Sequence, residues 1–191
     1  MDQTDSTPGY LTGQLLVAMP TMQDPRFEKS AIYICIHNAD GAMGLIVNRV
    51  LESLTFRDLL LQLKLDVDEP AIGIPVQYGG PVETSRGFVL HTLEYEQDGT
   101  IIIDQKVGLT ATVEVLRDIA VGRGPSRAIL ALGYAGWGAG QLDSEIQQNA
   151  WLNVPADDGL MFDTDIDSRW ERAMGKIGVN VSLLSGDHGH A

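Results

Sequence analysis

Four glycines fall within eight residues in the second half of the chain, at Gly133, Gly136, Gly138 and Gly140. The apolar run over residues 128–132 before them is typical of a buried strand. After Gly140, apolar residues recur every four positions at Leu142, Ile146 and Ala150, which indicates one face of a helix. Because glycine reaches backbone conformations closed to other residues, this segment predicts a strand, a glycine turn and a helix.

This glycine segment has two explanations. Free N–H groups at a helix N-terminus favour an anion such as a phosphate or a carboxylate. Alternatively, the glycines let the strand and the helix pack closely, with Trp137 as a plug in the core. No lysine of a phosphate loop lies near this turn, and Gln141 stands where the dinucleotide motif requires its third glycine. We therefore favour the packing explanation, with an anion site as the alternative.

Composition limits the class of protein. A length of 191 residues suits one domain, and a formal net charge of −13 argues against direct binding to nucleic acid. The one cysteine, Cys35, allows no internal disulfide and fits a reducing compartment. The start of the chain lacks the apolar core of a signal peptide, and no apolar run reaches the roughly 20 residues that span a bilayer. We expect a cytoplasmic protein with no membrane contact.

The spacing of apolar residues predicts an α+β fold with mostly antiparallel strands. Strands are expected over residues 30–37, 42–48, 72–78, 86–91 and 100–104, and helices over 54–64, 110–121 and around 169–177. The first two strands are joined by a short turn, which predicts an antiparallel hairpin. We expect a disordered lead-in over residues 1–9, one domain over 10–185 and a flexible tail over 186–191.

Two helix starts carry the pattern of a capping box. Thr55 with Asp58, and Ser168 with Glu171, place a hydroxyl residue three positions before an acidic one. Each pair is expected to satisfy free N–H groups at the beginning of its helix. These features predict local structure and no chemistry.

One expected strand carries a cysteine and a histidine, the residue types of a nucleophile and its base. Tyr33, Cys35 and His37 alternate along it and are expected to share one face. A nucleophile and its base must face each other within hydrogen-bond distance, whereas neighbours two apart on a strand point in parallel. We interpret Cys35 as a buried thiol and His37 as a histidine at the strand end.

Alternating aspartates at Asp163, Asp165 and Asp167 resemble the start of a calcium loop. That loop needs glycine and glutamate where Ser168 and Met174 stand, so the match fails. His188 and His190 near the C-terminus are, as two histidines alone, only a weak indication of a metal site. The sequence predicts no metal site and no cofactor.

The sequence contains no motif of a known catalytic machinery among those sought: a serine elbow, a His-Glu-x-x-His helix, a phosphate loop or a Cys-x-x-Cys pair. An enzyme or small-molecule site can still assemble from distant residues. Polar residues at strand ends and turns are where such a pocket is expected. Its candidate lining residues are Asn38, Asn48, Arg86, His91, Trp137 and Glu145.

Three stretches carry a family resemblance. They read Ala-Met-Pro, Asp-Pro-Arg-Phe and Gly-Ala-Met-Gly-Leu-Ile within residues 18–48, Gly-Gly-Pro-Val and Arg-Gly-Phe-Val-Leu-His within 79–91, and Leu-Gly-Tyr with Asn-Ala-Trp-Leu within 132–152. Together they resemble the bacterial AlgH/YqgE family over nearly the whole chain. The resemblance implies a cytosolic α+β protein with a branched β-sheet folded into a pseudo-barrel and flanked by helices.

The resemblance implies little chemistry, because the family has no agreed activity or catalytic residues. The family's name comes from a proposed role in regulating alginate genes, which does not require contact with DNA. The resulting hypothesis is a non-enzymatic binding or regulatory protein, with an indirect role in transcription, that acts through a protein partner or a small ligand. The alternatives are the enzyme or small-molecule pocket and a direct nucleic-acid regulator.

Overall fold

The computed structural model describes residues 9–65 and 73–181, and more of these residues lie in strands than in helices. The strands are β1 (Gln14–Ala18), β2 (Ala31–Asn38), β3 (Gly41–Ile46), β4 (Val76–Tyr78), β5 (Val82–Thr92), β6 (Ile101–Ile102), β7 (Val107–Thr110), β8 (Ala128–Gly138) and β9 (Trp151–Pro155). The helices are α1 (Phe56–Gln62), α2 (Val113–Ala120), α3 (Gln141–Gln147), α4 (Asp158–Phe162) and α5 (Arg169–Lys176). Residues 1–8, the acidic stretch 66–72 and residues 182–191 lie outside the described part, and so do the expected tail and its two histidines.

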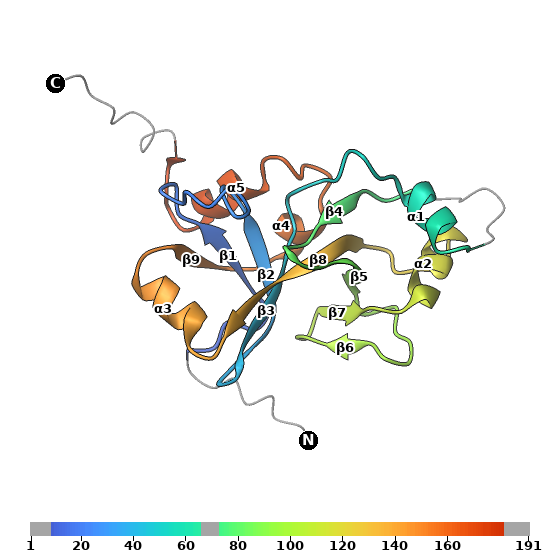
Figure 1. The fold of residues 1–191 in the computed structure, drawn as a ribbon, viewed down its shortest axis with the longest axis horizontal. Coiled ribbons are helices and arrows are strands. Elements are labelled where there is room, and N and C mark those ends of the chain that lie inside the picture. The colour runs from blue at the N-terminus through green and yellow to red at the C-terminus, as the bar shows by residue number, and fades with distance from the viewer. Residues whose placement is uncertain (1–8, 66–72, 182–191) are drawn as a thin grey trace.

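The sheet branches at β8, the long strand near the middle of Figure 1. The first half of β8 pairs with β5 along one edge and in parallel with β4 along the other, and its second half pairs with β3. The strand order is β6-β7-β5-β8-β3-β2-β1-β9, and the two end strands, β6 and β9, do not pair with each other. The curled sheet is therefore a half-barrel and not a closed barrel. Within the described residues, all strand pairs except β4 with β8 are antiparallel. The expected α+β single domain with a mostly antiparallel sheet is confirmed.

The expected turn after residue 132 is wrong, because β8 continues through Gly133, Gly136 and Gly138 and the chain turns only at Gly140. Gly133 has a φ of +76°, and a Cβ added there would overlap the carbonyl oxygen of Gly80. Only glycine allows the two backbones to approach so closely. Gly133 therefore serves close backbone packing inside the branched sheet.

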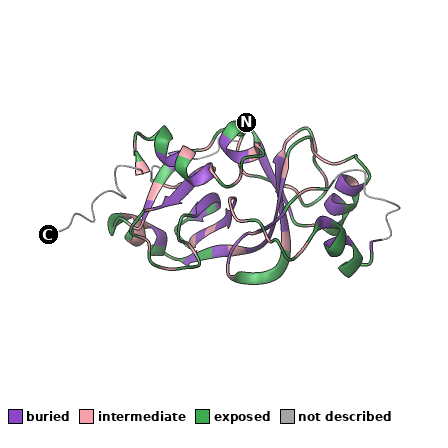
Figure 2. Ribbon diagram, turned by 90° about the horizontal axis from the view of Figure 1, so that it is seen from above, coloured by how far each residue is buried: buried purple, intermediate pink, exposed green. Residues whose placement is uncertain are grey.

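Helices cover the sheet at separate places, and Figure 2 shows buried residues on their inner faces and along the strands. Helix α5 contributes Trp170 to a cluster with residues of β1, β2 and β5. Phe56 of α1 and Val115 of α2 belong to a second cluster with residues of β4, β5 and β8. A third cluster under α3 contains Trp137, which is 7% exposed, so its expected place in the core is confirmed.

The two expected capping boxes have different outcomes. At α1 both bonds are present, from the Asp58 N–H to Thr55 Oγ1 and from the Thr55 N–H to the Asp58 carboxylate. At α5 the box is wrong, because Ser168 lies at φ −88° and ψ −1° and makes no side-chain cap. A serine caps the first turn of a helix when its own backbone is extended, and the backbone of Ser168 is helical. Its Oγ instead accepts a hydrogen bond from Arg172 Nε.

The hairpin of β2 and β3 is confirmed, but the expected shared face of its residues is wrong at His37. A β-bulge shifts the register between Ile34 and Ile36. Cys35 packs in the cluster under α5, whereas His37 lies opposite Ala42, which belongs to the cluster under α3. An extra residue in one strand reverses the faces of the side chains that follow it. The bulge therefore separates Cys35 from His37.

Glu94, just after β5, fastens this strand to the loop before β8. Its carboxylate accepts hydrogen bonds from Thr92 Oγ1 at 2.8 Å and from the Ser126 N–H. Desolvation alone would raise the pKa of Glu94, but these hydrogen bonds outweigh it and hold the pKa at about 2. A carboxylate with a lowered pKa stabilises the folded state above its unfolded pKa, and this contribution is lost as the pH falls toward 2.

We expect Glu94→Gln to flatten the fall in the free energy of unfolding at acid pH. Wild type and Glu94→Gln should differ most at neutral pH and converge between about pH 4.5 and pH 2, which urea denaturation across this range measures. Glu96→Gln, two residues along, is the control for the loss of one negative charge. Parallel pH profiles for wild type and Glu94→Gln would contradict this assignment.

Candidate functional site

Three of the six predicted pocket residues lie at one end of the sheet. Asn38 pairs with Gly41 at the end of the hairpin, and its side chain accepts a bond from the Asp40 N–H at 2.9 Å. Trp137 lies on the neighbouring β8, and Glu145 lies on α3 in side-chain contact with Trp137. Desolvation raises the pKa of Glu145 against the lowering effect of its hydrogen bond with Trp137.

The other three predicted residues lie apart. Asn48 accepts a bond from the Ala31 N–H at 2.9 Å and donates one to the Lys29 carbonyl at 2.8 Å. The exposed Arg86 lies 3.4 Å from a Glu83 carboxylate oxygen on the surface. His91 is fully buried. The structure therefore spreads the six candidates over several places, and none of them lines the two hollows described below.

His91 belongs to a chain of buried hydrogen bonds. Its Nδ1 lies 3.0 Å from the Thr92 carbonyl, which can only accept, so Nδ1 donates this hydrogen bond. Nε2 lies 2.7 Å from Thr110 Oγ1, and Thr110 Oγ1 lies 2.7 Å from Thr100 Oγ1. A Cβ added at Gly108 would lie 3.1 Å from the imidazole, so the ring is tightly enclosed. This arrangement supports the end of the sheet and leaves no room for a substrate.

Cys35 is 2% exposed, and burial raises the pKa of its thiol far above the ordinary value. A thiol in this state is a poor nucleophile and a poor metal ligand. No group of three or more His, Cys, Asp or Glu within residues 9–65 and 73–181 is placed to hold a metal ion. Over the same ranges, no helix has the length and apolar character needed to cross a bilayer.

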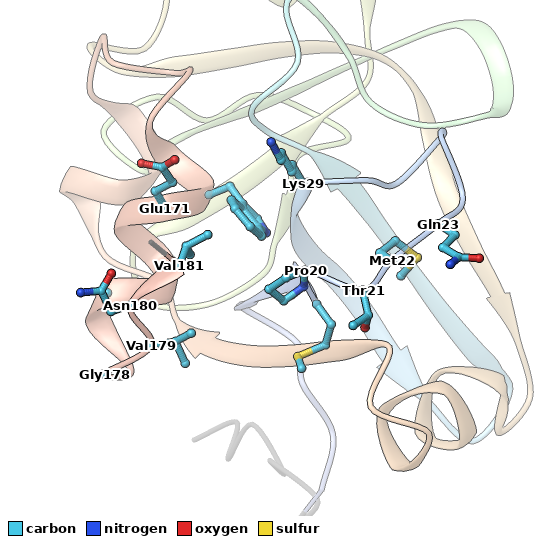
Figure 3. A pocket seen from close by; sticks show the side chains of 13 residues that line it. Pro20, Thr21, Met22, Gln23, Lys29, Glu171, Gly178, Val179, Asn180 and Val181 are labelled. Atoms are coloured by element: carbon cyan, nitrogen blue, oxygen red, sulfur yellow. The ribbon is translucent and has the colours of Figure 1, made fainter. Parts of the chain in front are cut away.

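A large open groove lies between α5 and the segment that follows β1, with a volume of about 1350 Å³ (Figure 3). Its apolar lining comes from Met19, Pro20 and Met22 on one wall and from Trp170 and Val179 on the other. The Trp170 indole donates a hydrogen bond to the Ala18 carbonyl at 2.9 Å, which fastens α5 to the end of β1. The two walls are therefore held at a fixed separation.

The groove also carries one cation and one anion, Lys29 and Glu171. Within the described part of the chain, neither side chain forms an ion pair. A smaller hollow of about 80 Å³ lies between α1 and α2, lined mainly by leucine and valine. Its volume suits one aliphatic side chain at most, so the groove beside α5 is the stronger candidate site.

Sequence reasoning missed this groove. Residues 19–23 form a connector with no periodicity, and the wall opposite them comes from a helix about 150 positions later. The available signals were two methionines beside a proline, at positions 19, 20 and 22, and a tryptophan on the α5 face. Methionine is frequent on adaptable binding surfaces, but its position in the sequence alone does not reveal the opposite wall.

Comparisons with known proteins agree with this architecture. A family model described as AlgH-like matches residues 15–182. A UPF0301 protein of Rhodospirillum rubrum is 55% identical over 96% of this chain and 95% of its own length. A second UPF0301 protein, from Methylocella silvestris, is 54% identical over 95% of this chain and 92% of its own.

Two solved structures share the fold. The solution structure of the AlgH protein from Pseudomonas aeruginosa matches with a TM-score of 0.79 and 43% identity, covering 100% of both chains. A Corynebacterium diphtheriae protein matches with a TM-score of 0.73 at 20% identity over 97% of this chain and 94% of that one, which shows the fold alone. The family model and these relatives show that the chain belongs to the AlgH-like family.

Proposed function

We propose that this protein is a non-enzymatic binding protein of the cytoplasm that acts by holding a short segment of a partner protein in the groove beside α5. The observation that carries this proposal is the groove itself, about 1350 Å³ in volume and lined by methionines, a proline and a tryptophan. Pockets for small molecules measure roughly 300–1,000 Å³ and enclose most of their ligand. A larger, open groove with apolar walls suits an extended peptide segment better.

The chemistry of the groove supports binding over catalysis. Lys29 and Glu171 are its charged lining residues, and they are not paired with each other or with another described side chain as a base and nucleophile would be. The net charge of −13 disfavours nucleic acid as the bound partner. A regulatory role, including an indirect one in transcription, would then arise through the bound protein.

Filling the groove tests the proposal. Gly175 lies on α5 at the groove, and a Cβ added there meets no atom within 4 Å. Gly175→Trp therefore places an indole into open space, and tryptophan has a higher helix propensity than glycine, which costs about 0.5–1 kcal/mol relative to alanine. We expect the variant to fold normally and to capture about 10-fold less of its protein partners from native cytosol, because the indole clashes with a bound segment.

Gly175→Ala is the matched control, since it makes the same backbone change and leaves the groove open. Captured proteins are quantified by mass spectrometry for wild type and both variants, with equal thermal stability checked first. Partners retained by Gly175→Ala and lost by Gly175→Trp support the proposal. Equal capture by both variants, or capture of nothing above background by wild type, contradicts it.

A further inference from the structure

The segment before β2, residues 24–29, is fastened by two adjacent side chains that follow β3. Asn48 donates to the Lys29 carbonyl at 2.8 Å, and Arg49 donates to the Arg26 carbonyl at 2.7 Å and to the Glu28 carbonyl at 3.2 Å. Three backbone carbonyls of this segment are thereby bonded by two neighbouring side chains. The result is a rigid segment at the edge of the groove, with Lys29 as its last residue.

Lys29 has a φ of +53°, a left-handed conformation that glycine adopts at no steric cost. The chain nevertheless places a lysine there, and Figure 3 shows its side chain on the wall of the groove. Asn48, one of the residues predicted from the sequence to line a pocket, thus holds the backbone of a groove residue. Asn48 therefore fixes the backbone from which the Lys29 side chain extends.

The opposite wall carries the opposite charge. Glu171 belongs to the first turn of α5, and Figure 3 shows it across the groove from Lys29. Met19, Pro20 and Met22 supply apolar surface in the same groove. A segment bound here therefore meets apolar side chains, with a positive group on one wall and a negative group on the other.

We infer that the groove selects partner segments with an apolar or aromatic anchor flanked by an acidic side chain at Lys29 and a basic side chain at Glu171. This inference rests on the proposed function and names the chemistry of its partner. Opposite charges on two fixed walls also fix the direction of the bound chain, because the reversed orientation places like charges together. Lys29 and Glu171 are then the specificity-determining residues.

The test selects ten-residue random peptides displayed on phage against the full chain. Wild type is expected to enrich peptides with an apolar anchor between an acidic and a basic residue. Lys29→Glu should replace the acidic preference with a basic one, and Glu171→Lys should replace the basic preference with an acidic one. Each reversal is expected to weaken the peptides selected by wild type about 5- to 10-fold, and less at high salt.

Lys64→Glu is the matched control, because Lys64 is also an exposed lysine with a φ of +54° but lies at the end of α1, outside the groove lining. It should leave the peptide preference unchanged. Lys29→Gly separates recognition from folding, since it relieves the left-handed backbone and removes the side chain that carries the ammonium. It should retain thermal stability and lose the acidic preference.

The outcomes separate this inference from the proposed function. Suppose that wild type enriches peptides that Gly175→Trp does not bind. If Lys29→Glu and Glu171→Lys then select peptides with the same charge preference as wild type, the inference alone is overturned. If wild type enriches nothing above Gly175→Trp, both fail. Enrichment of sequences matching residues 182–191, or self-association that Gly175→Trp abolishes, would assign the groove to this chain itself and also overturn the inference.

Discussion

Replacing Gly133 with alanine is expected to lower the free energy of unfolding by about 3 kcal/mol. Part of the loss is conformational, because a non-glycine residue at a φ of +76° costs about 1–2 kcal/mol. The rest is steric. The new Cβ would overlap the Gly80 carbonyl oxygen and lie 3.1 Å from the Val82 carbonyl oxygen, and forcing atoms into a packed site costs about 1–3 kcal/mol.

Gly140→Ala is the matched control for this prediction. Gly140 has a similar φ of +71°, but a Cβ added there meets nothing within 4 Å. Only the conformational part of the cost applies, so we expect a loss of about 1 kcal/mol. Urea denaturation followed by tryptophan fluorescence measures both variants. Equal losses would show that close packing of β8 against the segment after β4 contributes little, and would contradict the architectural account of the glycines.

Arg169→Met is expected to cost about 3 kcal/mol, because Arg169 is a buried charge with fixed partners. It is 1% exposed and donates hydrogen bonds to the Val47 carbonyl and to the Asp163 carbonyl, the latter at 2.9 Å. Methionine keeps the apolar stem of the side chain but leaves the buried carbonyl of Val47 without its donor. The Asp163 carboxylate would also lose a contact at 3.3 Å.

Arg172→Met is the matched control, because Arg172 pairs with the same carboxylate but has a side chain that is 34% exposed. Solvent screens this pair, so its loss should cost about 1 kcal/mol or less. Denaturant melts at neutral pH compare both variants with wild type. If Arg169→Met is no less stable than Arg172→Met, the buried bonds of Arg169 do not hold α5 to the β3 end of the sheet as described.

Local patterns predicted local structure well. The capping box of Thr55 and Asp58, the hairpin of β2 and β3, and the helix after Gly140 depend on residues close in sequence. The burial of Trp137 followed from an aromatic residue surrounded by glycines. In these cases propensity, periodicity and tertiary packing favour the same conformation, so the sequence alone is informative.

Features that depend on distant contacts could not be predicted in this way. The extension of β8 through its glycines requires the pairing with β3, and short strands such as β7 and β9 are fixed by neighbours rather than by their own pattern. Residues 110–112 were expected in a helix, but Thr110 ends β7 and Thr112 precedes α2. The bulge in β2 and the burial of Arg169 left no readable signal. The branched sheet itself entered through the family resemblance.

At the candidate site, too, local features could be predicted from the sequence and contacts between distant segments could not. Asn48 and Arg86 were found as polar residues near strand ends, but polar character alone does not distinguish a structural bond from a binding contact. The groove joins residues 19–29 to residues 170–181, and only the folded chain brings these segments together. The prediction of a pocket around Asn38, Trp137 and Glu145 stays untested, and binding experiments must be able to detect it.

Hydrogen–deuterium exchange on the complex of this protein with a captured partner tests the central claim most directly. If a partner segment lies in the groove, backbone amides of residues 19–23 and of residues 170–181 should exchange more slowly in the complex than in the free protein. Protection confined to another surface, such as the α3 end near Asn38 and Glu145, or an unchanged pattern in a stable complex, would contradict the account.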